Sequence, residues 1–186
     1  MDVELLIWIN QGWANPWFDT FFIWISEKYT FSFPLLAILV LYFGIKYGKP
    51  GWMLGLLILL VPALADFIGS LLKDFFLHPR PCFEYSQLLR KPGGISKACL
   101  LSTGGMPSNH AINFFAVFTF LSVVLQRWPL TIVFISLSIL VGISRIYLAN
   151  HFPSQVFVGA LIGAILGYTF AWLSVKCWPF LGNIMR

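Results

Sequence analysis

The sequence predicts an all-α membrane protein, a polytopic bundle of five to six transmembrane helices. Hydrophobic residues make up 59% of the 186 residues, and charged residues make up only 10%. Soluble domains carry about 25% charged residues. The apolar residues also fall in long runs, and a helix needs about 20 such residues to cross the hydrocarbon core. These properties together place the chain in a bilayer.

Five apolar runs are the predicted spans, because polar residues, glycine or proline bound each of them. In chain order they cover residues 33–47, 52–72, 111–125, 130–148 and 156–178. Some runs are short for a full crossing, but Trp and Tyr residues at their ends indicate anchoring at the membrane interface. We therefore expect all five to span, and to extend into the neighbouring polar residues.

The first 30 residues contain two apolar patches, at residues 5–9 and 17–25. Between them lie Asn10, Gln11, Asn15 and Pro16, which interrupt a continuous span. This pattern predicts either an interfacial helix or a broken sixth span. The amino terminus lacks a basic start and a small-residue cleavage site, so no cleaved signal peptide is expected.

Residues 77–107 form the long polar stretch of the chain and are the predicted extramembrane loop. Prolines and glycine pairs interrupt it, so little helix is expected there. Cys82 and Cys99 bracket part of this loop. They form a disulfide if the loop faces an oxidising compartment, and otherwise remain two buried thiols. Because no internal repeat or linker divides the chain, residues 1–186 are predicted to form a single domain.

Composition argues against two classes of function. The net charge is +5, but no basic run or basic-aromatic surface appears outside the apolar segments, so nucleic-acid binding is not expected. The three cysteines show neither CxxC nor His-Cys metal spacing. We expect no metal site and no cofactor, and the sequence does not predict an oligomeric state.

The predicted topology brings several polar segments to one side of the membrane. If each run crosses once, Lys73, the 77–107 loop, His110 and the 145–155 turn lie at the same face. An active site at one membrane face is therefore expected. Basic residues are spread almost evenly over both faces, so charge alone does not orient the chain.

Basic and imidazole side chains at that face define the candidate site: Lys73, Arg80, His110, Arg145 and His151. Cationic side chains at membrane depth need a partner, but no Asp or Glu follows Glu84 in the sequence. A bound anion is the remaining partner, and a phosphate suits the planar fork of arginine and the point charge of lysine. Taken singly, Lys73 and Arg80 could equally be residues that extend their charged ends to the membrane interface.

Residues 106–110 lead directly into the third predicted span. Backbone N–H groups at a helix amino terminus bind anions, and the Ser108 hydroxyl is expected to cap this helix. The two histidines can then divide phosphoryl transfer, one attacking phosphorus and the other protonating the leaving group. Neither role requires a metal.

Further polar residues lie near this constellation. Asp66 precedes Lys73 by two helical turns on the same helix face, and we expect it to pair inside the bundle. Candidates for the surrounding shell are Asp74, His78, Asn113 and Tyr147.

Three motifs, in this order, resemble those of the type 2 phosphatidic acid phosphatase superfamily. K-x6-R-P matches residues 73–81, P-S-G-H matches residues 107–110, and S-R-x5-H-x3-D matches residues 144–155. The resemblance implies that His151 is the nucleophile and His110 the general acid. It also implies a set of phosphate-binding residues: Lys73, Arg80, Ser108, Asn109, Ser144 and Arg145.

Two residues depart from the family pattern. Asn109 stands in place of glycine, and asparagine tolerates unusual backbone conformations better than most residues. Gln155 stands in place of an aspartate that would orient His151 and stabilise its developing charge. An amide can accept a hydrogen bond from the ring N–H but stabilises the developing positive charge less than a carboxylate does. Asp66 and Asp74 are the alternative sources of a carboxylate.

The resemblance implies a lipid phosphate or pyrophosphate phosphatase of the bacterial envelope. Its implied substrates are undecaprenyl pyrophosphate, the 1-phosphate of lipid A, phosphatidylglycerol phosphate and phosphatidic acid. The loop cations Arg90, Lys91 and Lys97 favour a bulky or multiply charged head group. The expected location is the bacterial inner membrane, among lipids, with the active site on the periplasmic face.

Three other functions remain as alternatives. A non-catalytic lipid-phosphate binding or flipping protein would use the same cations without turnover. A vanadate-dependent haloperoxidase shares such a site, but those enzymes are not built from membrane spans. A channel or transporter is disfavoured because the later spans lack acidic residues.

Overall fold

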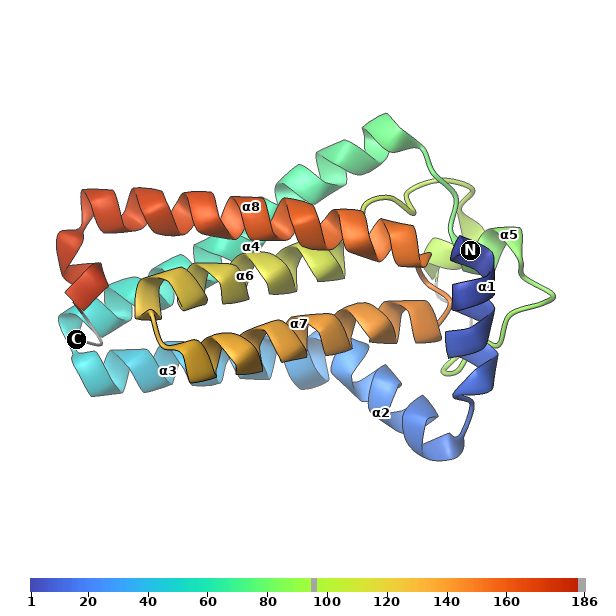
Figure 1. Cartoon of the computed structure of the whole chain (residues 1–186), viewed down its shortest axis with the longest axis horizontal. Helices are drawn as coiled ribbons and strands as arrows, with labels where there is room; N and C mark the ends of the chain where they lie inside the picture. The colour runs from blue at the N-terminus through green and yellow to red at the C-terminus, as the bar shows by residue number, and fades with distance from the viewer. Residues whose placement is uncertain (95–96, 184–186) are drawn as a thin grey trace.

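The computed structural model describes residues 1–94 and 97–183 and confirms an all-α bundle over that part of the chain. Its long helices run side by side along the long axis (Figure 1). They are α3 (Phe33–Tyr47), α4 (Lys49–Phe76), α6 (Asn109–Leu125), α7 (Trp128–Tyr147) and α8 (Pro153–Cys177). In the described part of the chain, four segments are long and apolar enough to cross a membrane: Lys28–Tyr47, Lys49–Phe76, Trp128–Tyr147 and Pro153–Cys177. Each of the five predicted runs is thus a helix, and α6, with 17 residues, is the one that lies outside these four segments.

The ends of α4 lie beyond the predicted run 52–72. The helix begins at Lys49 with Pro50 in its first turn, where a missing N–H costs nothing. It continues through Lys73 to Phe76 because a basic residue in the last turn suits the negative end of the helix dipole. This extension carries Lys73 to the end of the bundle where the loop begins.

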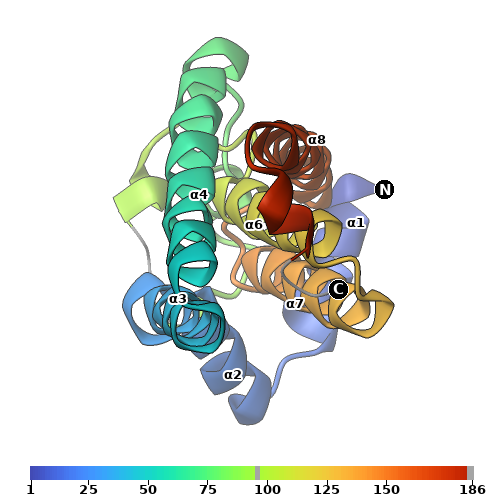
Figure 2. The ribbon, with the colours of Figure 1, turned by 90° about the vertical axis from the view of Figure 1, so that its left-hand side faces the viewer.

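Helix α6 lies at the centre of the bundle, between α4, α7 and α8 (Figure 2). Glycines on α8 allow it to approach α6 closely. A Cβ on Gly159 would lie 2.7 Å from the Ser108 carbonyl oxygen, and one on Gly163 would lie 2.4 Å from that of Ile112. Small residues at such contacts are typical of membrane helix pairs. This contact holds the start of α6 beside the start of α8.

The first 30 residues do not form one continuous span. Helix α1 (Asp2–Ile7) continues as η1 (Trp8–Gly12) across the end of the bundle, and α2 (Pro16–Ser26) then runs obliquely toward α3 through η2 (Lys28–Ser32) (Figure 1). Asn15 begins α2, because its side chain accepts a hydrogen bond from the Phe18 amide at 2.9 Å. The end of α2 therefore lies beside the end of the bundle that holds the polar loop.

The loop between α4 and α6 contains the short helices α5 (Pro81–Glu84) and η3 (Lys97–Leu100). A disulfide joins Cys82 to Cys99, which confirms the first alternative drawn from the sequence. The Cys82 amide also donates to the Ala149 carbonyl at 3.0 Å. The loop is thereby fixed to the turn between α7 and α8.

Candidate active site

A cavity of about 490 Å³ lies at the end of the bundle, between the loop and the helix ends. Six of the predicted site residues line it: Lys73, Arg80, Asn109, His110, Arg145 and His151. The convergence expected from the topology is therefore present in the fold. The cavity is also lined by residues that the sequence did not single out: Ser26, Glu27, Lys28 and Asn150.

His151 is buried in the turn between α7 and α8, and its two ring nitrogens have different partners. Nδ1 lies 2.8 Å from the Gly105 carbonyl oxygen and 3.2 Å from Gln155 Oε1. Both partners are acceptors, so Nδ1 carries the proton. Nε2 accepts from Arg80 Nη1 at 3.1 Å. Nε2 is therefore the unprotonated ring nitrogen, and it lies on the side of the ring that faces Arg80.

The pKa of the His151 imidazole lies well below its ordinary value of 6.5. Burial is the main cause, and the positive charges of Arg80, Arg145 and Lys73 add to it. The ring is consequently neutral at pH 7. A neutral imidazole whose Nε2 is unprotonated has the protonation state that a nucleophile requires.

Backbone carbonyls hold the guanidinium of Arg80 in place. Nη1 donates to the Asn150 carbonyl at 3.2 Å, and Nη2 donates to the Gly104 carbonyl at 2.9 Å. Burial lowers the pKa of this group. None of these partners carries a negative charge, so the cation is fixed without being neutralised.

Arg145 and Lys73 also lack a carboxylate in direct contact among the residues that the structure describes. Arg145 Nη1 donates to the Ser26 hydroxyl, while its buried Nε has no partner within the described chain. No hydrogen bond within the described chain holds the Lys73 ammonium, which lines the cavity. An unpartnered guanidinium nitrogen and a free ammonium at one cavity provide donors for an anion.

Asp66 is the nearby acid, and two asparagine side chains bind it. Its Oδ1 accepts from Asn109 Nδ2 at 2.9 Å and from Asn113 Nδ2 at 3.2 Å. The expectation that Asp66 pairs inside the bundle is confirmed. In the described chain neither Asp66 nor Asp74 hydrogen-bonds to His151, so no carboxylate takes the place of Gln155.

Gln155 is fully buried and uses both ends of its amide. Oε1 accepts from the Phe152 amide at 3.1 Å as well as from His151. Nε2 donates to the Pro79 carbonyl at 2.7 Å and to His78 Nδ1 at 3.0 Å. Since a carbonyl oxygen can only accept, the amide orientation is fixed. Gln155 therefore links the loop to the ring of His151, and a carboxylate could not make the two donor contacts.

Two predicted phosphate ligands lie outside the cavity lining. The expected side-chain cap from Ser108 is absent; its buried hydroxyl has no partner within the described chain, and its amide donates to the Gln155 carbonyl at 3.1 Å. The Ser144 hydroxyl donates to the Val141 carbonyl at 2.6 Å, one turn back in α7. Serine hydroxyls inside helices often bond in this way. The side chain of Ser144 is thus directed at its own helix.

Ser26, the last residue of α2, contacts two of the predicted site residues. Its carbonyl accepts from His110 Nε2 at 3.1 Å, and its hydroxyl accepts from Arg145. His110 Nδ1 makes no hydrogen bond within the described chain and can carry the second proton of the ring. The sequence pattern did not identify Ser26, because the first 30 residues contain no motif that connects them to the site.

A second cavity, of about 740 Å³, lies between α3, α4 and α6 and is mostly apolar. Leu36, Val40, Pro62 and Phe114 are among its lining residues. It adjoins the cationic cavity, and three residues line both: Lys28, Asp66 and His110. An apolar groove in the spans thus leads to a cationic cavity at their ends.

No group of three or more His, Cys, Asp or Glu side chains that could hold a metal ion occurs within residues 1–94 and 97–183. The site that the structure describes is built instead from arginine, lysine and histidine.

Comparison with known proteins gives a consistent picture. Residues 52–179 match the family model of the PAP2 superfamily. The lipid A 4'-phosphatase of Porphyromonas gingivalis is 27% identical over 190 residues, which cover 95% of this chain and 79% of that protein.

Two solved structures share the fold. The crystal structure of Aquifex aeolicus LpxE superposes with a TM-score of 0.66 and 31% identity, over 91% of this chain and 93% of that one. The phosphatidylglycerolphosphate phosphatase of Bacillus subtilis, described as a transmembrane PAP2-type enzyme, has a TM-score of 0.71 at 24% identity, over 96% and 88% of the two chains.

Proposed function

This chain belongs to the PAP2 superfamily and is a membrane phosphatase acting on lipid phosphates; from that premise we propose that it dephosphorylates envelope lipids through a phosphohistidine on His151. The candidate substrates are undecaprenyl pyrophosphate, lipid A 1-phosphate and phosphatidylglycerol phosphate. The observation that carries the proposal is the neutral, buried ring of His151, whose Nε2 lies 3.1 Å from Arg80 at a cavity with further cations.

In the first step the terminal phosphate binds between the cations Lys73, Arg80 and Arg145. Nε2 of His151 attacks phosphorus, and the bond from phosphorus to the leaving oxygen breaks. His110 gives a proton to that oxygen, so the lipid leaves as an alcohol or as a lipid monophosphate. The cations stabilise the charge on the transferring phosphoryl group.

In the second step water hydrolyses the phosphohistidine. His110, now neutral, takes a proton from the water, which attacks phosphorus and breaks the bond to Nε2. Inorganic phosphate leaves and His151 is restored. Gln155 keeps Nδ1 protonated through both steps, because its Oε1 accepts from that nitrogen. We assign it as a positioning residue.

The remaining predicted ligands have supporting roles in this proposal. The unpartnered hydroxyl of Ser108 and the backbone N–H groups at the start of α6 are donors available to a phosphate. Asn109 holds Asp66, and Ser144 supports the last turn of α7 before Arg145.

Two further observations support a lipid substrate and an outward-facing site. The apolar groove that meets the cationic cavity suits a hydrocarbon chain. The disulfide in the loop favours an oxidising compartment, which for a bacterial inner membrane is the periplasmic side.

The test is phosphate release from a panel of lipid phosphates in detergent without added metal, comparing the wild type with His151→Ala. We expect release by the wild type and a loss of at least about 10³-fold in the variant. If the wild type binds lipid phosphate but releases none, the protein is a lipid-phosphate binding or flipping protein and the proposal is wrong. Release by His151→Ala at the wild-type rate would remove His151 as the nucleophile.

A further inference from the structure

Lys28 lies at the junction of the two cavities. It is in η2, between α2 and α3, and lines both the apolar groove and the cationic cavity. His110, the proposed acid, also lines both. Lys28 is not part of the three motifs that bind the transferred phosphate.

The charge at the cationic cavity exceeds what one phosphate needs. Its described lining contains five cations, Lys28, Lys73, Arg80, Lys91 and Arg145, and two carboxylates, Glu27 and Asp66. With His151 neutral and His110 protonated as the proposed acid, four positive charges remain. A phosphate monoester carries about −2 at pH 7, and a second phosphate adds about one charge more. The balance thus suits a diphosphate.

A lipid diphosphate consists of a terminal phosphate, a second phosphate and a hydrocarbon chain, in that order. The cavities offer matching surroundings in the same order: the cations near His151, the junction of the two cavities, and the apolar groove. The terminal phosphate lies at His151 and Arg80, since the attack occurs there. The hydrocarbon chain lies in the apolar groove. The phosphate that stays on the lipid is between them, at the junction that Lys28, His110 and Asp66 line, where Lys28 is the fixed cation and Asn109 and Asn113 bind the Asp66 carboxylate. The oxygen that His110 protonates is the bridging oxygen, which leaves with this second phosphate.

We propose that Lys28 binds the phosphate that remains on the lipid, so that the enzyme prefers a lipid diphosphate to the lipid monophosphate of the same chain. This inference rests on the proposed function. Attack of His151 Nε2 on the terminal phosphorus breaks its bond to the bridging oxygen. The lipid monophosphate leaves with a proton from His110, and Lys28 compensates its charge. Water then releases the terminal phosphate from His151.

Lys91 offers a matched control. It lines the cationic cavity but not the groove, and its ammonium donates to the Ser86 carbonyl of its own loop at 2.6 Å. Its removal takes one positive charge from the same cavity. If the net charge of the cavity alone set the preference for a diphosphate, Lys91→Ala would lower it as much as Lys28→Ala. If the second phosphate binds at the junction of the cavities, only Lys28→Ala lowers it.

The experiment measures kcat/KM for an isoprenyl diphosphate and the isoprenyl monophosphate of equal chain length in detergent. Lys28→Ala is expected to lower the ratio of the two values about tenfold, Lys28→Arg to keep it, and Lys91→Ala to leave it unchanged. Turnover of the monophosphate by Lys28→Ala also reports that the variant is folded.

Three outcomes would overturn the inference. In the first, Lys28→Ala lowers kcat/KM equally for both substrates, or for neither of them. In the second, Lys91→Ala changes the ratio as much as Lys28→Ala does. In the third, the wild type cleaves a water-soluble short-chain diphosphate as well as the long-chain one, so that the groove has no part in binding. A wild type that releases phosphate from none of these compounds would instead contradict the proposed function itself.

Discussion

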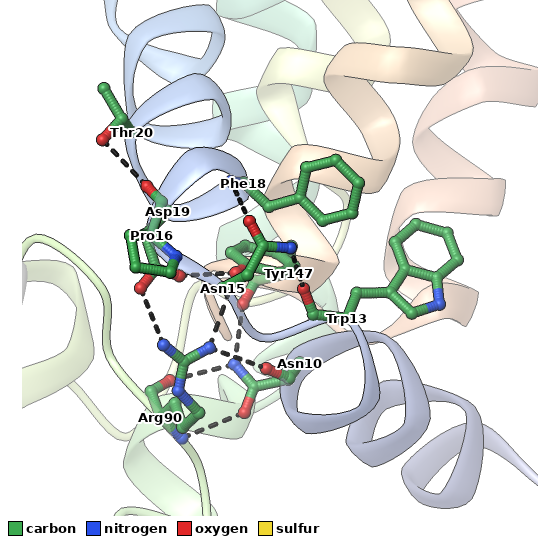
Figure 3. Close-up of polar contacts among 9 residues, drawn as sticks. All are labelled: Asn10, Trp13, Asn15, Pro16, Phe18, Asp19, Thr20, Arg90 and Tyr147. Atoms are coloured by element: carbon green, nitrogen blue, oxygen red, sulfur yellow. Dashed lines mark hydrogen bonds and ion pairs between the residues drawn. The ribbon is translucent and has the colours of Figure 1, made fainter.

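Two arginine clusters at the same end of the bundle are built in opposite ways. Arg90, in the loop, forms an ion pair with Asp19 at 2.7 Å, and the Tyr147 hydroxyl donates to the other oxygen of Asp19 at 2.5 Å (Figure 3). Asn10 joins this cluster by accepting from Arg90 and donating to the Tyr147 carbonyl at 2.7 Å. In the cationic cavity, by contrast, the guanidinium of Arg145 donates to the hydroxyl of Ser26 and has no carboxylate in direct contact among the described residues.

The difference distinguishes a cation paired within the protein from the cations that we propose bind substrate. Hydrogen bonds to Tyr147 and Asp19 raise the pKa of Arg90, whereas burial lowers the pKa of Arg80. The charge of Arg90 is paired within the protein, whereas the described lining of the cationic cavity has more cations than carboxylates. Arg90 is paired with Asp19 and is not among the residues that line the cationic cavity, while Lys91 does line it; the side chain of Lys97 lies outside the described residues. The preference for a bulky or multiply charged head group stays a prediction.

Removal of Arg145 should have the largest effect on activity. We expect Arg145→Ala to lower kcat/KM about 10³-fold, or about 4 kcal/mol of transition-state stabilisation. Its thermal stability should not fall, because the change removes a cation that has no carboxylate in direct contact within the described part of the chain. Phosphate release and thermal unfolding in detergent measure the two effects. Strong destabilisation with normal activity would mean that Arg145 is a structural cation like Arg90.

Loss of the disulfide should mainly affect stability. The bond closes a loop across a sequence separation of 17 residues, for which chain entropy predicts about 3 kcal/mol. Cys82→Ser with Cys99→Ser is expected to lower the midpoint of thermal unfolding, and a reductant should do the same to the wild type. The double variant itself should not respond to the reductant. An unchanged midpoint would show that the contacts of the loop alone fix it.

The sequence predicted the helices well, because their signal is local. Hydrophobic runs give each span, and the run at residues 33–47 coincides with α3. The three motifs also placed Arg80 and His151 at one face, since alternate crossings bring their segments together. These inferences need only the length of a run and the order of the runs.

Contacts between distant segments could not be predicted in this way. Ser26 contacts His110 and Arg145 because α2 returns obliquely to the end of the bundle, and no local pattern reports that path. The capping bond expected of Ser108 is absent, and its backbone amide donates to the Gln155 backbone carbonyl on α8. This bond joins the starts of α6 and α8, which no local pattern connects.

Substitution of Gln155 shows whether an amide can orient His151 at the position where the family has a carboxylate. Gln155→Glu keeps the size but loses the donors to Pro79 and His78, so kcat is expected to fall about tenfold. A carboxylate beside the ring favours the charged imidazolium and raises the pKa of His151. Since the neutral ring is the nucleophile, the acidic limb of the pH profile should move up by about one unit.

The control for this prediction is Gln155→Ala, which removes the contacts without adding charge. It should lose activity at least as strongly, but leave the acidic limb below pH 6.5, where burial and the neighbouring cations hold the pKa of His151. Identical pH profiles for the two variants would mean that residue 155 does not act on the charge of His151.

The smallest effect is expected at the Arg90 cluster. The side chains of Arg90 and Asp19 are 36% and 27% exposed, so their pairing contributes only about 1 kcal/mol to folding. Asp19→Asn should lower stability by about that amount and change kcat/KM less than threefold, because Arg90 is not among the residues that line the cationic cavity. Thermal unfolding and phosphate release of Asp19→Asn, Arg90→Gln and the double variant measure the coupling. A loss of activity as large as that of Arg145→Ala would mean that the charge of Arg90 is used in catalysis after all, and that an internal ion pair does not distinguish structural from substrate-binding arginines in this fold.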